Sequence, residues 1–437
     1  MTYWLRLAAC EMKCLRSNTV ALICRDFRLW RQTIAASAPL NEFELVAACC
    51  RWPRGAARDA AVLSAADAVD WDRVERVTRR HRVYAQVHDA LTRAGVAVPQ
   101  RVAGKLADAA RQAGMSALTM AREATRLQDA FDAAGCPALF VKGSSLAMLA
   151  YGELGLKWAW DIDLLTTPAA AAQGRTILEG LGYVLVEPEG MDARQFALFL
   201  TLGKECVFVH AETRIAVELH WKLVDNPYLL TGVDALSPTR TVPIGGRALR
   251  TLDGPALLAY LLVHGTRHAW SRLKWLADVA ALLAHYPTDA IAPLYRELQA
   301  LQAGRAAAVG FLLCHDLLGV ALPGALLAEL RADRATRRLV ATAHAALTHG
   351  RGEREVSTYT LPGIRTLFSH LTVAPGWRPF LWELGAKWTC SADRLALPLP
   401  RPLWFLYHVL RVPLWIWRRG GIALRSLRPA ATAARAG

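Results

Sequence analysis

The spacing of apolar residues changes twice along this chain of 437 residues. Up to residue 133, and again after residue 254, apolar side chains recur every three or four positions, which predicts helices. Between these parts, starting at Gly135, short apolar runs typical of strands alternate with turns and short helical segments. We therefore expect an α+β fold in which a small mixed sheet is flanked by an N-terminal and a C-terminal helical layer.

The predicted elements follow this division. Helices are expected over 41–50, 70–90 and 101–133 before the sheet, and over 257–286, 291–317 and 326–347 after it. Strands are expected over 138–141, 161–165, 205–210 and 215–221, the last two forming a hairpin, with helical segments ending near 151 and 181. The expected parts are an extension (1–40), a helical layer (41–130), a sheet domain (131–235), a helical domain (236–348) and a tail (349–437).

The composition is that of a folded and strongly basic protein. Hydrophobic residues make up 54% of the chain and charged residues 20%, unlike the balance of a disordered chain. Lys and Arg number 52 against 37 Asp and Glu, so the net charge of +15 would attract phosphate-bearing partners, nucleic acid or anionic lipid without choosing among them. The nine scattered Cys favour free thiols in a reducing compartment.

The sequence favours a cytoplasmic location. Charged residues interrupt the first 30 positions, which leaves no apolar run long enough for a signal peptide. The apolar stretch 402–417 contains His408, Arg411 and Pro413 and is shorter than the ~20 residues that a spanning helix needs.

The tail after residue 349 is rich in Pro, Trp and Arg, which predicts an irregular segment wrapped around the helical layers. We expect most of its Trp rings to be buried against those layers, although Trp and Arg together could also stack on bases or lie at a membrane interface. Peripheral attachment to an anionic membrane stays open for one segment, where four basic residues flank an apolar run: Arg411, Arg418, Arg419 and Arg425.

Two carboxylates are separated by one residue in Asp161-Ile162-Asp163. On a strand both project from the same face, while Ile162 points into the core. Two adjacent negative charges call for a counter-charge, which a hard divalent cation such as Mg²⁺ supplies through carboxylate oxygens. An isolated pair of this kind is more often two solvated acids, but the neighbouring segments of the sequence favour a metal site.

Both neighbouring segments offer groups that suit such a site. Upstream, a strand leads into Gly143-Ser144-Ser145 and then into a helix, so backbone N–H groups and two hydroxyls would face an anion at the start of that helix. Downstream, Glu218 and His220 share the polar face of a strand, which adds a third carboxylate. His220 could contact a phosphate or the acceptor, or it could be a structural histidine.

These segments together resemble the nucleotidyltransferase superfamily of the DNA polymerase beta type. They are similar to the bacterial uncharacterised nucleotidyltransferase family proteins, in which a K-G-x-x-L turn, R-x-x-x-D-I-D-L-L and V-D-L-H-W occur in order. The corresponding segments here are Lys142-Gly143-Ser144-Ser145, Asp161-Ile162-Asp163-Leu164-Leu165 and Val217-Glu218-Leu219-His220-Trp221. The resemblance runs roughly from residue 41 to residue 347 and implies a polymerase beta-like sheet.

The resemblance also implies residue roles. Asp161, Asp163 and Glu218 would be catalytic and would bind Mg²⁺ (or Mn²⁺), two ions serving the transfer. Nucleotide binding would fall to five residues: Lys142, Gly143, Ser144, Ser145 and Lys157. Lys157 stands where the family usually has Arg, and Glu218 where it usually has Asp; both replacements keep the sign of the charge. Glu218 could act as general base instead of metal ligand.

A second stretch carries residues that could line the same cleft. His264 and His268 have the i, i+4 spacing of metal ligands, but packing and cleft lining are favoured over zinc. Arg267 and Lys274 are candidate phosphate contacts, although a solvated basic face is the commoner explanation for such residues. The resemblance includes a similar H…W…L…D stretch that ends here at Asp278.

The resulting hypothesis is an Mg²⁺-dependent nucleotidyltransferase. It would move a nucleoside monophosphate, AMP by preference, from an NTP to a hydroxyl of a small molecule, sugar or peptide, with release of pyrophosphate. Nucleic acid is not favoured as a partner, because no separate module for it is recognisable. Two alternatives stay open: a degenerate member of the fold that binds nucleic acid or anionic membrane, and nucleotidylation (AMPylation) of a partner protein.

Overall fold

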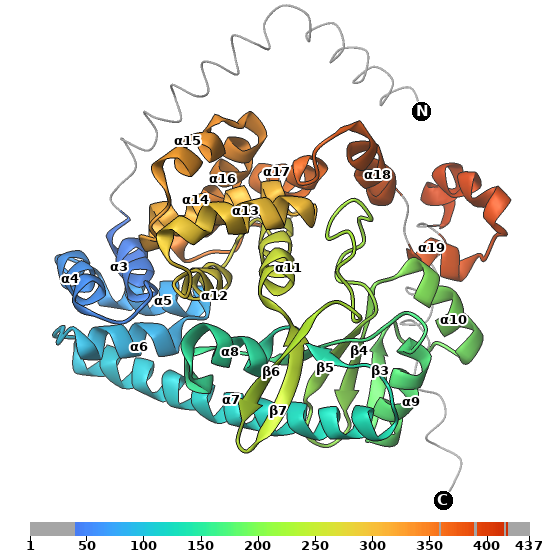
Figure 1. Ribbon diagram of the computed structural model, residues 1–437, viewed down its shortest axis with the longest axis horizontal. Helices are drawn as coiled ribbons and strands as arrows, with labels where there is room; N and C mark the ends of the chain where they lie inside the picture. The colour runs from blue at the N-terminus through green and yellow to red at the C-terminus, as the bar shows by residue number, and fades with distance from the viewer. Residues whose placement is uncertain (1–39, 358–359, 389–390, 415–416, 418–437) are drawn as a thin grey trace, which may run out of the picture. The chain divides into compact units, whose positions relative to one another are not determined.

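A five-stranded mixed sheet carries the candidate residues in the computed structural model, which describes residues 40–357, 360–388, 391–414 and 417 (Figure 1). Its strands are β1 (Leu139–Phe140), β2 (Asp161–Leu165), β3 (Tyr183–Glu187), β4 (Glu205–His210) and β5 (Ala216–His220). The order is β1-β2-β5-β4-β3, with β2 and β5 parallel and the other neighbours antiparallel. This confirms the predicted small mixed sheet and the β4–β5 hairpin.

The alternation of residues along β2 and β5 explains the two unlike faces of the sheet. Ile162, Leu164, Val217 and Leu219 are buried together with Phe131 of the long helix α7 (Gln100–Ala133). The same face is covered by α9 (Ala171–Gly180), which packs on β5. Burying each such side chain contributes about 1.5–3 kcal/mol, so the apolar face is held against α7 and α9. The acidic residues are therefore left on the opposite face.

The N-terminal helical layer contains one more break than its sequence indicates. It consists of α3 (Asn41–Cys49), α4 (Ala56–Ala65), α5 (Trp71–His81), α6 (Tyr84–Arg93) and α7. The helix predicted over 70–90 is wrong as a single element: α5 ends because Arg82 adopts the left-handed conformation, φ 57°. Its N–H then bonds to the Arg79 carbonyl at 3.2 Å. No Gly or Pro marks this turn, so the sequence gives no local signal for it.

Several elements of the sheet region lack a sequence prediction. The helix α8 (Gly143–Tyr151) agrees with the expected segment, whereas α10 (Ala193–Leu202) and β3 were not predicted. A second, two-stranded sheet of β6 (Thr239–Ile244) and β7 (Arg247–Leu252) was also missed. Its turn is Gly245-Gly246, both with positive φ, and Gly-Gly is a recognisable hairpin signal.

The second helical layer contains twice as many helices as predicted. The three expected helices are each divided, giving α11 (Gly254–Arg267), α12 (Leu273–Leu283), α13 (Ile291–Ala300), α14 (Gly304–Leu318), α15 (Gly324–Ala332) and α16 (Arg334–Leu347). The first division lies at Ala269 and Trp270, both with φ 48°. The Trp270 ring is fully buried, and Gly265 and Gly310 leave room for it: a Cβ at Gly265 would lie 2.5 Å from the ring. Packing of this ring therefore sets the turn.

Most of the tail that the structure describes is helical, so the expectation of an irregular segment is wrong for that part. It forms α17 (Leu361–Ser369), α18 (Trp377–Trp388), α19 (Ser391–Ala396) and a 3₁₀ turn (Arg401–Leu406), followed by a helical run over 407–414. Pro362 and Pro402 lie in first turns, where a missing N–H costs nothing.

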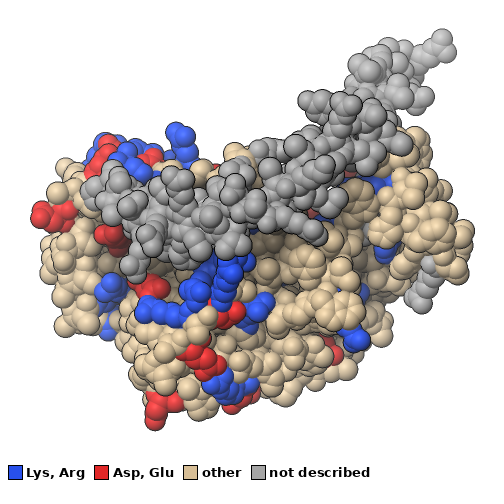
Figure 2. Space-filling view, turned by 90° about the horizontal axis from the view of Figure 1, so that it is seen from above, with Lys and Arg blue, Asp and Glu red and all other residues tan. Residues whose placement is uncertain are grey.

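The expected burial of the tail's Trp rings is also wrong for several of them, since Trp377, Trp388 and Trp417 are more than half exposed. The basic residues Arg418, Arg419 and Arg425 lie outside the described residues, as does the extension up to residue 39. Among the described helices, none is both long enough and apolar enough to cross a bilayer. On the face shown in Figure 2, Lys and Arg side chains gather in a central group, with Asp and Glu interspersed.

Candidate active site

The polar face of β2 and β5 brings acidic side chains from two strands together. In the parallel ladder Asp163 pairs with Glu218, so the two carboxylates start from neighbouring positions on one face. Asp163 is almost fully buried, whereas the Glu218 side chain is 30% exposed. Asp161 lies two residues before Asp163 on the same face and is partly exposed. The three acids of the sequence hypothesis thus share one face of the sheet.

His220 lies among these acids rather than facing open solvent. Its Nε2 is 3.4 Å from Asp163 Oδ1 and 3.4 Å from Glu218 Oε2, and its Nδ1 is 2.9 Å from Glu205 Oε2. Burial lowers the pKa of His220, but the three carboxylates outweigh this effect and raise the pKa to about 10. The ring is therefore a cation at neutral pH. Glu205, the first residue of β4, was not predicted as part of the site.

Lys142 supplies a second cation inside the site. Its Nζ donates a hydrogen bond to Asp163 Oδ1 at 2.7 Å and lies 5.2 Å from the centre of the Tyr260 ring. Burial raises the pKa of Asp163, but Lys142 and then His220 reverse this and hold it well below its ordinary value. Asp163 is thus ionised and neutralised by two protein cations.

Asp161 has a different environment. Burial, followed by the charges of Asp163 and Glu218, raises its pKa to about 6, and no cation is in direct contact with it among the described residues. A cation placed beside it would relieve the repulsion between these carboxylates. Asp161 is therefore the acid of this face whose charge is least compensated within the described structure.

The donor set suits a divalent cation. Asp163, Glu218 and His220 offer ligand atoms that all lie within 4.8 Å of one another. Carboxylate oxygens are the hard donors that Mg²⁺ and Mn²⁺ prefer. Asp161 stands beside this group but is not one of its three members. Because the His220 ring is a cation at neutral pH, it would have to lose a proton to bind a metal, so the ligands that this face offers are its carboxylates.

A narrow cleft of about 40 Å³ adjoins the acids. It collects eight residues that the sequence singled out: Lys142, Gly143, Lys157, Asp161, Asp163, His264, Lys274 and Asp278. They come from the start of α8, the segment around the beginning of β2, α11 and α12. The expected meeting of the sheet with the second helical layer at one cleft is therefore what the structure shows.

The turn before α8 contributes backbone more than hydroxyl groups. Gly143 lines the cleft with φ 61°, a conformation that favours glycine. The Ser145 hydroxyl is fully buried and donates to the Lys142 carbonyl at 2.9 Å, and Ser144 is buried as well. Anion binding here would depend on the N–H groups of the first turn of α8.

Positive charge surrounds the mouth of the cleft. Burial lowers the pKa of Lys274 to about 8, and Lys157 and Arg82 add to that shift. The Arg82 guanidinium lies 5.7 Å from the Trp160 ring and is within electrostatic range of Asp161. Arg82 was not among the residues predicted from the sequence, because only the left-handed turn after α5 directs it toward the start of β2.

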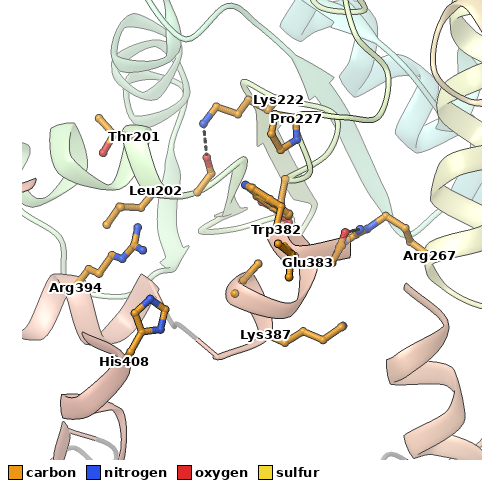
Figure 3. A pocket seen from close by; sticks show the side chains of 15 residues that line it. Thr201, Leu202, Lys222, Pro227, Arg267, Trp382, Glu383, Lys387, Arg394 and His408 are labelled. Atoms are coloured by element: carbon orange, nitrogen blue, oxygen red, sulfur yellow. Dashed lines mark hydrogen bonds and ion pairs between the residues drawn. The ribbon is translucent and has the colours of Figure 1, made fainter. Parts of the chain in front are cut away.

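The remaining candidates take other positions. The ring centroids of His264 and His268 are 4.5 Å apart, with the rings tilted by 50°, and both rings pack on Trp275, in agreement with the packing interpretation. Burial lowers the pKa of both rings, so they are neutral at neutral pH. Arg267 is not with the acids: it pairs with Glu383 of α18 at a second, larger cleft (Figure 3).

Comparison with known proteins identifies the family. Residues 67–319 match the family described as uncharacterised nucleotidyltransferase, which is more than half of the chain, so this protein belongs to that family. The match begins just before α5 and ends after α14, a shorter range than the 41–347 expected from the resemblance. No curated protein and no solved structure matches significantly.

Proposed function

We propose that this protein transfers a nucleoside monophosphate, AMP by preference, from an NTP to a hydroxyl acceptor and releases pyrophosphate. The observation that carries the proposal is the row of carboxylates on β2 and β5, Asp161, Asp163 and Glu218, beside a basic cleft. Membership of the family supports nucleotidyl transfer in general. The choice of nucleotide and acceptor is the proposal.

The chain offers groups for each part of the substrate. The triphosphate would be bound by the N–H groups at the start of α8 together with Lys274 and Arg82. Asp161, Asp163 and Glu218 would hold Mg²⁺ or Mn²⁺, which would lower the pKa of the acceptor hydroxyl and neutralise phosphate charge. Lys142 and His220 keep Asp163 ionised and in place.

Glu218 is the candidate general base. Unlike Asp163, its side chain is partly exposed, so an acceptor could reach it. The proton of the hydroxyl would pass to Glu218 Oε1 or Oε2 as the oxygen attacks the α-phosphorus. The His220 ring, 3.4 Å from Oε2, would hold this carboxylate in position.

The first test is binding of each of the four NTPs, with and without Mg²⁺, measured by calorimetry. We would compare the natural chain with Asp161→Asn, which removes the least compensated acid and leaves the buried Lys142–Asp163 pair intact. Asp108→Asn, an exposed site on α7, is the matched control for loss of one negative charge. We expect Mg²⁺-dependent binding of one NTP that Asp161→Asn abolishes and Asp108→Asn preserves.

Two results would contradict the proposal: no NTP binding by the folded natural chain, or binding that neither Mg²⁺ nor Asp161→Asn affects. The first would favour the nucleic acid or membrane binding role, and a salt-dependent shift on nucleic acid or vesicles would then be sought. If an NTP binds, incubation with labelled nucleotide and candidate acceptors separates small-molecule transfer from protein nucleotidylation, since the latter adds a nucleotide mass to a partner protein.

A further inference from the structure

A second cleft lies beside the acidic face and is much larger than the first. Its volume is about 840 Å³, within the range of small-molecule sites, whereas the cleft at the acids holds about 40 Å³. Its walls come from the end of α10, the loop after β5, the end of α11, and α18 and α19 (Figure 3). It therefore has room for a whole molecule that the acidic cleft lacks.

The second cleft is connected to the acids by a short stretch of sheet. Lys222, in its wall, follows His220 by two residues, and its N–H bonds to the Lys204 carbonyl at 3.2 Å. The next residue after Lys204 is Glu205, whose carboxylate contacts the His220 ring at 2.9 Å. A molecule seated in the cleft would thus lie next to the end of β5 that carries Glu218 and His220.

One charge pair in the wall is already satisfied. Glu383 of α18 is buried, pairs with Arg267 and accepts a hydrogen bond from Asn226 Nδ2 at 3.0 Å. Figure 3 shows this pair at one side of the cleft. Arg267 and Glu383 therefore join α11 to α18 and leave the net charge of the cleft to other residues.

Three further cations outnumber the remaining carboxylate, Asp225. Lys222 is exposed and donates a long hydrogen bond, 3.5 Å, to the Gly203 carbonyl. Lys387 lies 3.2 Å from His370 Nδ1, and burial followed by the charge of Lys387 lowers the pKa of that ring to about 4, so the partner is neutral. Neither lysine is paired with an acid among the described residues.

Arg394 is the third cation, and two aromatic rings hold its side chain in place. Its guanidinium lies 4.3 Å from the Trp404 ring and 5.6 Å from the Tyr407 ring, which fix it without neutralising it. Its Nε is buried and has no hydrogen-bond partner within the described part of the chain. The buried Nε offers no surface to the cleft, so an acidic ligand would bind through the Nη groups of the same guanidinium.

We infer that this second cleft binds the acceptor, and that the acceptor is a small molecule carrying a phosphate or carboxylate group besides its reacting hydroxyl. The acidic group would lie against Arg394, while Lys222 and Lys387 would add positive charge at other sides of the cleft, and the apolar surface of Trp382 would cover the body of the molecule (Figure 3). The inference rests on the proposed function. In the transfer the acceptor oxygen forms a bond to the α-phosphorus, the α–β bridging P–O bond breaks with its electron pair leaving on pyrophosphate, and Glu218 takes the proton.

The test uses the full chain without nucleotide. Inorganic phosphate and citrate are titrated by calorimetry as the phosphate and carboxylate probes, with glycerol as the uncharged control. We expect saturable binding of one anion, weakened about tenfold or more by Arg394→Gln or Lys222→Gln. Arg111→Gln, an exposed position on α7, removes one positive charge elsewhere and should leave binding unchanged.

Two outcomes overturn the inference. One is the absence of saturable binding of either anion; the other is binding that Arg82→Gln weakens and Arg394→Gln does not, which would place the anion in the nucleotide cleft. Mg²⁺-ATP binding is measured in the same variants as an independent test of the nucleotide site, and Arg394→Gln should leave the affinity for Mg²⁺-ATP unchanged. If the natural chain binds an anion but not Mg²⁺-ATP, the proposed function is refuted. If it binds Mg²⁺-ATP but neither anion, only the acceptor cleft is refuted.

Discussion

The ammonium of Lys157 is paired with the carboxylate of Asp278 inside the protein, where the two side chains are only 8% and 4% exposed. The Tyr151 hydroxyl donates to the other Asp278 oxygen at 3.0 Å. The pair joins the segment before β2 to α12 and so holds the second helical layer against the sheet. Lys157, expected to bind nucleotide, therefore has a structural partner at the edge of the cleft.

Removing one partner of this pair should destabilise the fold strongly. Asp278→Asn would leave the Lys157 ammonium buried without a counter-charge, and we expect a loss of about 3–5 kcal/mol in the free energy of unfolding. Urea unfolding measures it. Glu329→Gln breaks the exposed pair with Arg296 and serves as control, with an expected loss below about 1 kcal/mol. Equal losses in the two variants would show that Lys157 is solvated.

The two acids of β2 should respond to substitution in opposite directions. In metal-free buffer at neutral pH, Asp161→Asn removes a desolvated charge beside two others, and we expect about 1 kcal/mol of added stability. Asp163→Asn deprives Lys142 and His220 of their shared carboxylate, and a loss of about 3–5 kcal/mol is expected. Thermal and urea unfolding compare them, and a destabilising Asp161→Asn would contradict this assignment.

Substitution of Glu218 should lower the rate of nucleotidyl transfer more than the affinity for NTP. Glu218→Gln keeps the size of the side chain but removes the proton acceptor, so transfer should fall by about 10²–10⁴-fold. Glu218→Asp, the residue usual in the family, restores a carboxylate and should recover part of the rate. Single-turnover transfer and NTP calorimetry together measure this, and equal rates for the natural chain and Glu218→Gln would exclude the base role.

Lys274 should make nucleotide affinity pH-dependent. The pKa of Lys274 is about 8 without nucleotide, so the lysine is neutral above that pH. Binding of a triphosphate at such a pH must then be accompanied by protonation of Lys274. The affinity for Mg²⁺-ATP should therefore fall as the pH rises from about 7 to 9, by up to tenfold per pH unit above the pKa. Lys274→Arg stays charged and should flatten the profile. An unchanged slope in that variant would exclude Lys274 as the cause.

Arg82 allows backbone and side chain to be tested separately. Its φ of 57° suits glycine, so Arg82→Gly should keep stability or raise it by about 0.5–1 kcal/mol. The loss of the guanidinium should weaken ATP binding about tenfold while AMP binding changes little. Titrations of both nucleotides measure the difference. Equal weakening of AMP and ATP would place Arg82 away from the triphosphate.

The sequence by itself determined the elements of the sheet that carry the acids and the face on which they lie. In a strand, residues two positions apart lie on the same face, and this can be read from the sequence alone. The sequence therefore assigned four residues correctly to polar faces: Asp161, Asp163, Glu218 and His220. The family motifs then predicted that these faces belong to one site, and the parallel register of β2 and β5 agrees.

Only the tertiary structure decided which charges meet. Lys157 and Asp278 are 121 residues apart, and their pairing depends on how α12 packs against α8, which no local pattern encodes. The same holds for Glu205 next to His220 and for Arg82 within electrostatic range of Asp161. It also holds for Arg267, which pairs with Glu383 of α18 and not with the acids of the sheet. Long-range packing sets these distances, because side-chain periodicity specifies the orientation of a residue but not its neighbour from another element.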